Sequence, residues 1–179
     1  MNKALKILII VLCAVLLVTG TVAGTLAWLS AQTDPITNTF TIGQIGLTLA
    51  ETTGTSYKIV PGVDIAKDPT VTVAAGSETC WVFVKVEKTG WNDAILQYTM
   101  ADGWEQVPDQ PGVFYRKVTT SGDEQGFPVL AENKVTVPSN VTKDQLATLS
   151  APTLKFTAYA IQVAGFEENV AGAWNEFNH

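Results

Sequence analysis

The sequence predicts an all-β protein, an antiparallel β-sandwich with one or two short helices, preceded by an N-terminal signal peptide. Three observations support this fold class. Short segments rich in Val, Ile, Thr and aromatic residues recur along the chain after residue 40. Turn sequences that contain Gly, Pro, Asp and Asn separate these segments. The one long apolar run, residues 7–18, lies near the beginning of the chain.

The first residues have the three-part layout of a secretory signal peptide. Lys3 and Lys6 form a positive beginning, residues 7–18 form an uncharged apolar core, and small and polar residues follow. The apolar core is shorter than the ~20 residues that cross a bilayer as a helix. We therefore expect residues 1–27 to be a cleaved export signal, with a retained N-terminal anchor as the alternative.

Cleavage is expected after Ala27, so that the mature chain starts at Trp28. Cleavage after Ala23 would also satisfy the preference for small residues at the cleavage site. Residues 28–179 are then expected to form one secreted domain, whose stability comes from packing rather than from disulfides. Only one cysteine, Cys80, remains after cleavage.

The charge of the mature domain argues against two classes of partner. Loss of the two signal-peptide lysines leaves nine of the 11 basic residues against 17 acidic ones, a formal charge of −8 compared with −6 for the whole chain. Nucleic-acid binding needs clustered Lys and Arg, and anionic lipid repels an acidic protein. We expect no nucleic-acid partner and no stable membrane insertion after cleavage.

The expected strands follow from the alternation of apolar and polar residues. The strongest candidate is residues 80–87, CWVFVKVE, in which three valines share one face while Trp81 and Phe83 occupy the other. Apolar residues on both faces predict a central strand. The expected strands are residues 40–49, 70–73, 80–87, 113–118, 135–137 and 154–163.

The first of these strands changes its apolar parity at Gly43, where we expect a bulge or a bend. Two short helices are also expected. Residues 142–149 begin with a capping box formed by Thr142 and Gln145, and residues 166–177 carry one apolar face that we expect to pack on the sheet. That face contains Phe166, Val170, Trp174 and Phe177.

No catalytic or metal-binding motif is recognisable in the sequence. The one histidine is the terminal His179, and neither a zinc-ligand spacing nor a serine-hydrolase motif is present. We therefore expect no enzymatic activity, no cofactor and no metal. Cys80 is expected to be a buried apolar residue. Trp91 and Trp104 lie near loops and are expected to cover the ends of the core, with stacking on sugars as the alternative.

The segment GTLAWLSAQTDPITNTFTIGQIGLTL, residues 24–49, resembles the N-terminal signature of the TasA and camelysin-like family, whose signal peptides are processed by the SipW-type signal peptidase. Residues 69–87 and 154–166 resemble the core strands of that family. The resemblance implies a jelly-roll topology, whereas periodicity alone also allows an immunoglobulin-like one. The matching residues are Gly24, Thr25, Ala27, Trp28, Asp34, Asn38, Phe40, Gly43, Ile45, Leu47 and Leu49.

The resemblance implies a secreted structural protein of the cell surface or biofilm matrix. TasA-like fibres are built by donating an N-terminal strand to the next subunit, and a β-prone segment at a free chain end suits that role. Residues 28–49 are the expected donor segment, unless they form the first strand of their own domain. Alternatives are a carbohydrate-binding or adhesin module and, behind it, a camelysin-type metallopeptidase. The expected docking residues are Asn38, Phe40, Ile42, Ile45, Leu47 and Leu49.

Overall fold

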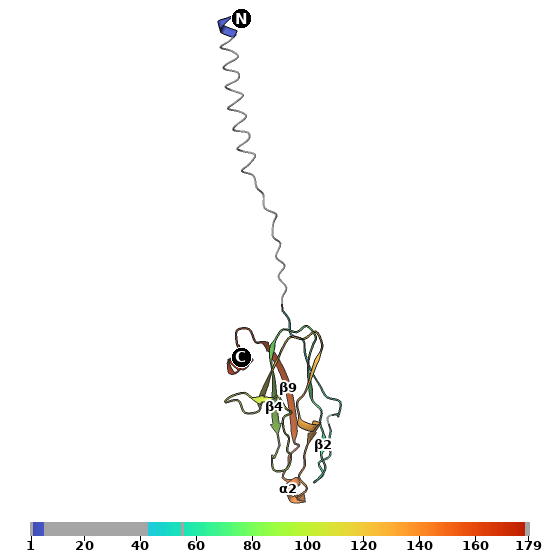
Figure 1. The fold of residues 1–179 in the computed structure, drawn as a ribbon. Helices are drawn as coiled ribbons and strands as arrows, with labels where there is room; N and C mark the ends of the chain where they lie inside the picture. Colours follow the sequence, from blue (N-terminus) through green and yellow to red (C-terminus); the bar gives the residue numbers. More distant parts are fainter. Residues whose placement is uncertain (1, 6–42, 55, 178–179) are drawn as a thin grey trace. The chain divides into compact units, whose positions relative to one another are not determined.

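The strands of this protein pair in three antiparallel sheets, which confirms the all-β prediction. The computed structural model describes residues 2–5, 43–54 and 56–177 (Figure 1). Its elements are β1 (Leu47–Ala50), β2 (Ile65–Ala66), β3 (Thr70–Val73), β4 (Cys80–Thr89), β5 (Glu105–Gln106), β6 (Val113–Val118), β7 (Gln125–Pro128), the 3₁₀ turn η1 (Ala131–Asn133), β8 (Lys134–Val135), α2 (Lys143–Ala147), β9 (Thr153–Gln162) and α3 (Val170–Asn175).

The chain divides into two units, residues 1–41 and 42–179. In the first unit the structure describes one helical turn, at residues 3–5. The expected signal peptide and the expected cleavage site between Ala27 and Trp28 therefore lie largely or wholly outside the described residues. In the described ranges no helix is both long and apolar enough to cross a membrane.

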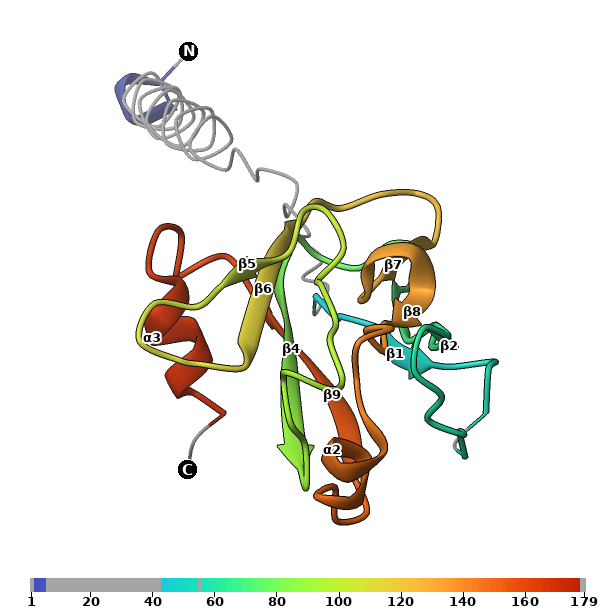
Figure 2. The same ribbon diagram turned by 90° about the horizontal axis from the view of Figure 1, so that it is seen from below.

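β4 lies at the centre of the largest sheet, which has the strand order β5-β6-β4-β9 (Figures 1 and 2). Val82, Val84 and Val86 are buried on one face of β4, and Trp81 and Phe83 are buried on the other. The prediction of a central strand is confirmed. A strand with two buried faces needs cover on both sides, and the rest of the domain supplies it.

Two separate clusters cover the two faces of β4. The valine face belongs to the main core, which also contains Val71 and Val73 of β3 and the half-buried Leu47 and Leu49 of β1. The smaller sheets, with orders β1-β3-β7 and β2-β8, contribute most of their apolar residues to this core.

The other face of β4 packs against α3 and the aromatic residues around it, on the side away from β1 (Figure 2). Phe83 is fully buried, with its ring centroid 5.4 Å from that of Trp174 and 6.0 Å from that of Phe177. The prediction that this helical face packs on the sheet is confirmed. The helix is shorter than the expected 166–177, because the Asn169 side chain caps its beginning by accepting from Gly172 N at 2.8 Å.

α2 has the predicted capping box. Gln145 N donates to Thr142 Oγ1 at 3.3 Å, and Thr142 N donates to Gln145 Oε1 at 2.8 Å. These bonds satisfy two backbone donors that the first turn of a helix leaves free.

The expected strand 40–49 is shorter in the described part of the chain, because β1 begins at Leu47. Residues 43–46 form backbone bonds with a turn instead of a ladder, with Glu78 N donating to Gln44 O and Ala74 N donating to Gly46 O. The parity prediction for Ile45, Leu47 and Leu49 is confirmed, since all three are half-buried and pack on the main core.

Candidate functional site: an open seam between two edge strands

β1 and β9 are the edge strands of two different sheets and lie in contact with each other. β1 pairs only with β3, and β9 pairs only with β4, so within the described ranges neither strand has a ladder partner on its outer side. We call the region between these two outer edges the seam. Unpaired backbone donors and acceptors at a sheet edge can accept another strand.

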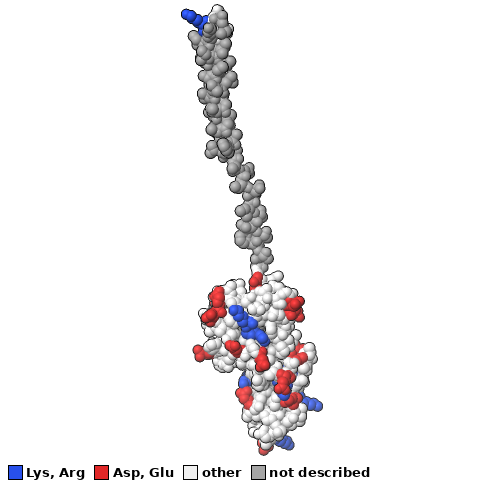
Figure 3. All heavy atoms as spheres, viewed as in Figure 1, with Lys and Arg blue, Asp and Glu red and all other residues white. Residues whose placement is uncertain are grey.

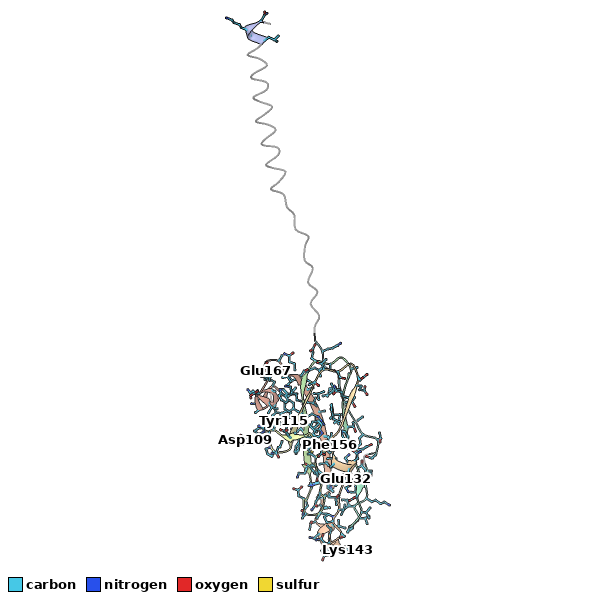
Figure 4. All side chains as sticks on the ribbon, in the orientation of Figure 1. Asp109, Tyr115, Glu132, Lys143, Phe156 and Glu167 are labelled. Carbon is cyan, nitrogen blue, oxygen red and sulfur yellow. The ribbon has the colours of Figure 1, made fainter. Side chains whose placement is uncertain are left out.

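β1 and β9 run in opposite directions along the seam, as the residues at its two ends show. At one end of the seam, a shallow cavity is lined by Gly43 together with residues 162–164 and 167. At the other end, a larger cavity is lined by residues 49–51 together with residues 152–156. Figure 4 shows the order of three residues along the domain: Glu167 lies near one end, Phe156 in the middle and Lys143 of α2 at the other end.

The larger cavity, here named the seam cavity, has a volume of about 610 Å³. Its walls combine aliphatic side chains with three aromatic residues, which is the composition typical of ligand and side-chain pockets. The apolar and aromatic lining residues are Leu49, Ala50, Tyr57, Ile59, Ile65, Pro69, Trp91, Leu96, Val135, Pro152, Leu154 and Phe156.

A buried ion pair forms the polar part of the seam cavity. Lys67 is only 8 % exposed, and its Nζ lies 2.6 Å from both carboxylate oxygens of Glu51. The ammonium also faces the rings of Tyr57 and Phe156, at 5.3 and 5.8 Å from their centroids. Tyr57 Oη donates to Glu51 Oε1 at 2.8 Å. These two charges neutralise each other, so that a neutral apolar group suits the buried part of the cavity, while the exposed Lys155 is the other charged residue of the lining.

Asp68, the next residue, holds the chain that follows β1. Its Oδ1 accepts from Thr52 N at 2.9 Å and from Thr53 N at 3.0 Å, and its Oδ2 accepts from Thr52 Oγ1 at 2.5 Å. The Thr52 hydroxyl and these backbone donors hold the pKa of the Asp68 carboxyl far below its usual range. The carboxylate is therefore charged at neutral pH.

The docking residues predicted for the donor strand fall into two groups. Leu47 and Leu49 are on β1 and pair with Val73 and Val71 of their own domain, and Ile45 precedes them on the same core. Asn38, Phe40 and Ile42 lie outside the described residues. In this structure the last residues of the expected donor segment, residues 47–49, are thus part of the first strand of their own domain.

The two loop tryptophans have different environments. Trp104 is buried, and its Nε1 donates to Pro128 O at 2.8 Å, which confirms that it covers the core. Trp91 is half-buried and lines the seam cavity, with its Nε1 donating to Asp93 Oδ1 at 3.1 Å. Of the two, Trp91 alone is placed to touch a ligand in the cavity.

The remaining chemical candidates are structural. Cys80 is fully buried, as predicted, and burial raises the pKa of its thiol to about 11. In residues 2–5, 43–54 and 56–177, no three His, Cys, Asp or Glu side chains are grouped so that they could hold a metal ion. Acidic side chains are spread over the face of the domain seen in Figure 3, with basic ones among them.

Sequence reasoning missed the residues that shape the seam cavity: Glu51, Tyr57, Lys67 and Asp68. All four lie in connections between strands, where charged and hydroxyl residues are ordinary. The Glu51–Lys67 pair is separated by 16 residues, so no local spacing rule could join it. Asp68 before a proline and a β-branched strand gave only a turn signal.

Comparison of the chain with protein-family models, curated proteins and solved structures found no match.

Proposed function

We propose that this chain is an exported structural protein of the cell surface or biofilm matrix, which assembles when residues 28–42 of one copy add to the seam of another copy. The observation that carries the proposal is the seam itself, in which two unpaired strand edges flank an apolar cavity. Strand addition to such edges gains main-chain hydrogen bonds, and pockets for alternate side chains give specificity.

The donor segment in this proposal ends before β1. Ile45, Leu47 and Leu49 pack on their own core, which leaves Phe40 and Ile42 as the apolar docking residues in the proposed donor segment. The segment has one charged side chain, Asp34, and the lining of the seam cavity carries one net positive charge, because Lys155 adds to the paired Glu51 and Lys67.

The resemblance of residues 24–49 to the TasA and camelysin-like signature supports two further parts of the proposal. Export would use residues 1–27, with cleavage between Ala27 and Trp28 by a SipW-type signal peptidase. N-terminal sequencing of the secreted protein tests this step, since Trp28 as its first residue is the expected result. A secreted form that retains residues 1–27 would contradict it.

The same resemblance supports a jelly-roll sandwich as the finer description of the fold. The valine face of β4 and the inward face of β3 share one core, as facing sheets of a sandwich do. An experimental structure of the secreted form, with its sheet order and loop crossings, would decide between this topology and an immunoglobulin-like one.

Assembly is tested by comparing the chain that starts at Trp28 with a chain that starts at Gly43, using sedimentation velocity over a concentration series. We expect the longer chain to form concentration-dependent oligomers or fibres and the shorter chain to remain monomeric. Identical monomeric behaviour of both chains at high concentration would overturn the proposal.

A second candidate function is carbohydrate binding, which the position of Trp91 favours. Trp91, Tyr57 and Phe156 line one cavity, and aromatic faces of this kind can stack on sugar rings. Glycan pull-down with Trp91→Ala tests this candidate, with Trp104→Phe as the control outside the cavity. A glycan that the wild-type protein and Trp104→Phe retain and Trp91→Ala loses would support this candidate. If the wild-type protein retains no glycan, the candidate fails.

A further inference from the structure

The chain after β1 is fastened to the chain before β3 by two side-chain clasps on consecutive residues. In the first clasp, Lys67 Nζ bonds both oxygens of Glu51. In the second, the Asp68 carboxylate accepts from the backbone and hydroxyl groups of Thr52 and Thr53. Both clasps lie just beyond the Ala50–Thr70 pair, where the β1–β3 ladder ends.

The two clasping residues are themselves anchored by the backbone. Lys67 N donates to Asn133 O at 2.7 Å, and Val129 N donates to Pro69 O at 2.8 Å. Pro69 is fully buried, which fixes the backbone direction directly after Asp68. The clasps thus join the chain after β1 to a connection whose backbone is itself hydrogen-bonded to Asn133 and Val129.

The other end of β1 is fastened by a turn. Gly46 N donates to the hydroxyl of Ser77 at 3.1 Å, and that hydroxyl donates to Ala74 O at 2.7 Å. Ser77 is 5 % exposed. β1 itself has only four residues, so that these contacts at its two ends supply much of what keeps it in place.

We infer that Lys67 and Asp68 are positioning residues for assembly, because they lock β1 into its own domain and so keep its outer edge available to an incoming strand. This inference deepens the proposed function: exchange between copies is confined to the chain before Gly43. Exchange of an identical element between copies is a low-cost route to dimers, and a weakly specified strand register favours it.

Hydrogen exchange measured on the secreted protein tests the lock directly. In Asp68→Ala we expect the amides of β1 to exchange at least about tenfold faster, since one clasp is lost, while the amides of β4 keep their protection. Asp68→Asn keeps one acceptor oxygen, so its β1 amides should exchange at a rate between those of the wild-type protein and of Asp68→Ala. The matched control is Asp64→Ala. It removes an exposed carboxylate that pairs with Lys134 of β8, and β8 belongs to a different sheet from β1. Unchanged protection of β1, or an equal loss in β1 and β4, would overturn the inference.

Exchange of β1 between copies can be measured separately, through the formation of an intermolecular disulfide. Thr48 of β1 faces Thr72 of β3 in the ladder, so when a chain with Thr48→Cys is mixed with a chain with Thr72→Cys, the two new thiols are held together for an intermolecular disulfide when β1 of one copy pairs with β3 of the other. We expect such dimers in the Asp68→Ala background and none with Asp68 intact. A single chain that carries both cysteines is the control for geometry. Dimers formed equally in both backgrounds, or in neither, would overturn the inference.

These two measurements are independent of strand donation. The exchange of β1 amides and the Thr48–Thr72 disulfide do not require residues 28–42 to bind another copy. If the chain that starts at Trp28 stays monomeric while the lock behaves as expected, the proposed function fails and the lock stands. If the chain assembles but β1 exchanges freely with Asp68 intact, the lock fails and assembly stands.

Discussion

β4 and β1 illustrate two ways of fixing a strand. β4 has ten residues, pairs on both sides and buries apolar side chains on both faces. β1 has four residues, pairs on one side and has alternating half-buried and exposed positions. Burial can determine the position of β4, whereas β1 combines partial burial and one ladder with hydrogen bonds at both ends and an ion pair beyond one of them.

The difference explains why one strand suits a core and the other suits an interface. A side chain buried in β4 contributes about 1.5–3 kcal/mol of transfer free energy, and several such side chains make the strand hard to displace. Polar clasps contribute less individually, but they leave the outer edge of β1 uncovered. A strand fixed in this way can be stable in its own domain and still present a free edge to a partner.

The largest effect is expected from Phe83→Ala in β4. Phe83 is fully buried and contacts Trp174 and Phe177, so its truncation leaves a cavity and should lower the free energy of unfolding by about 3–5 kcal/mol. Urea denaturation followed by tryptophan fluorescence measures the change. Lys85→Ala, on the same face but with 42 % of its side chain exposed, is the control and should cost under about 0.5 kcal/mol. Similar losses in both variants would contradict the burial argument for β4.

Gly46→Val should perturb β1 locally and less severely. A Cβ at Gly46 would lie 2.7 Å from the Cβ of Ala74, so the turn that holds β1 must shift, at a cost of about 1–3 kcal/mol. Faster hydrogen exchange in β1 than in β4 is the expected signature. Gly122→Ala provides the control, because a Cβ there meets no atom within 4 Å. Unaltered exchange in β1 would show that the turn is not what fastens it.

The smallest effect concerns the pH dependence of Cys80 in β4. Burial raises the pKa of its thiol from 9.0 to about 11, so the folded state favours the neutral thiol. This contribution is complete below the pKa of the unfolded chain and is lost as pH rises toward the folded value. Between about pH 8 and about pH 10, the wild-type protein should lose about 1 kcal/mol more stability than Cys80→Val. Equal losses would mean that the thiol can ionise within the folded protein.

Burial patterns in the sequence were enough to predict β4 and the packing of Trp174 and Phe177. Apolar residues on both parities of residues 80–87 can be satisfied only at the centre of a sheet. The start of β1 was not predictable in this way, because Gly46 is held by Ser77, a residue 31 positions away. Long-range side-chain bonds leave no periodic trace in a single sequence.

The seam was also beyond sequence reasoning, for a related reason. Segments 40–49 and 154–163 were both expected to be strands, but periodicity does not show which strands lie at sheet edges or which edges meet. The clasps by Lys67 and Asp68 join partners across a turn, where spacing carries no signal. Residues 45–49 pack on their own domain in this structure, which agrees with the alternative that the sequence left open, and strand donation by residues 28–42 stays a prediction.

The most direct test of the assembly proposal adds a peptide of residues 28–42 to the chain that starts at Gly43 and measures hydrogen exchange in β1 and β9. Strand addition at the seam predicts that outward-facing amides of both strands become protected while the amides of β6 stay unchanged. Binding that protects neither strand, or no binding at the concentration where the longer chain assembles, would contradict the account.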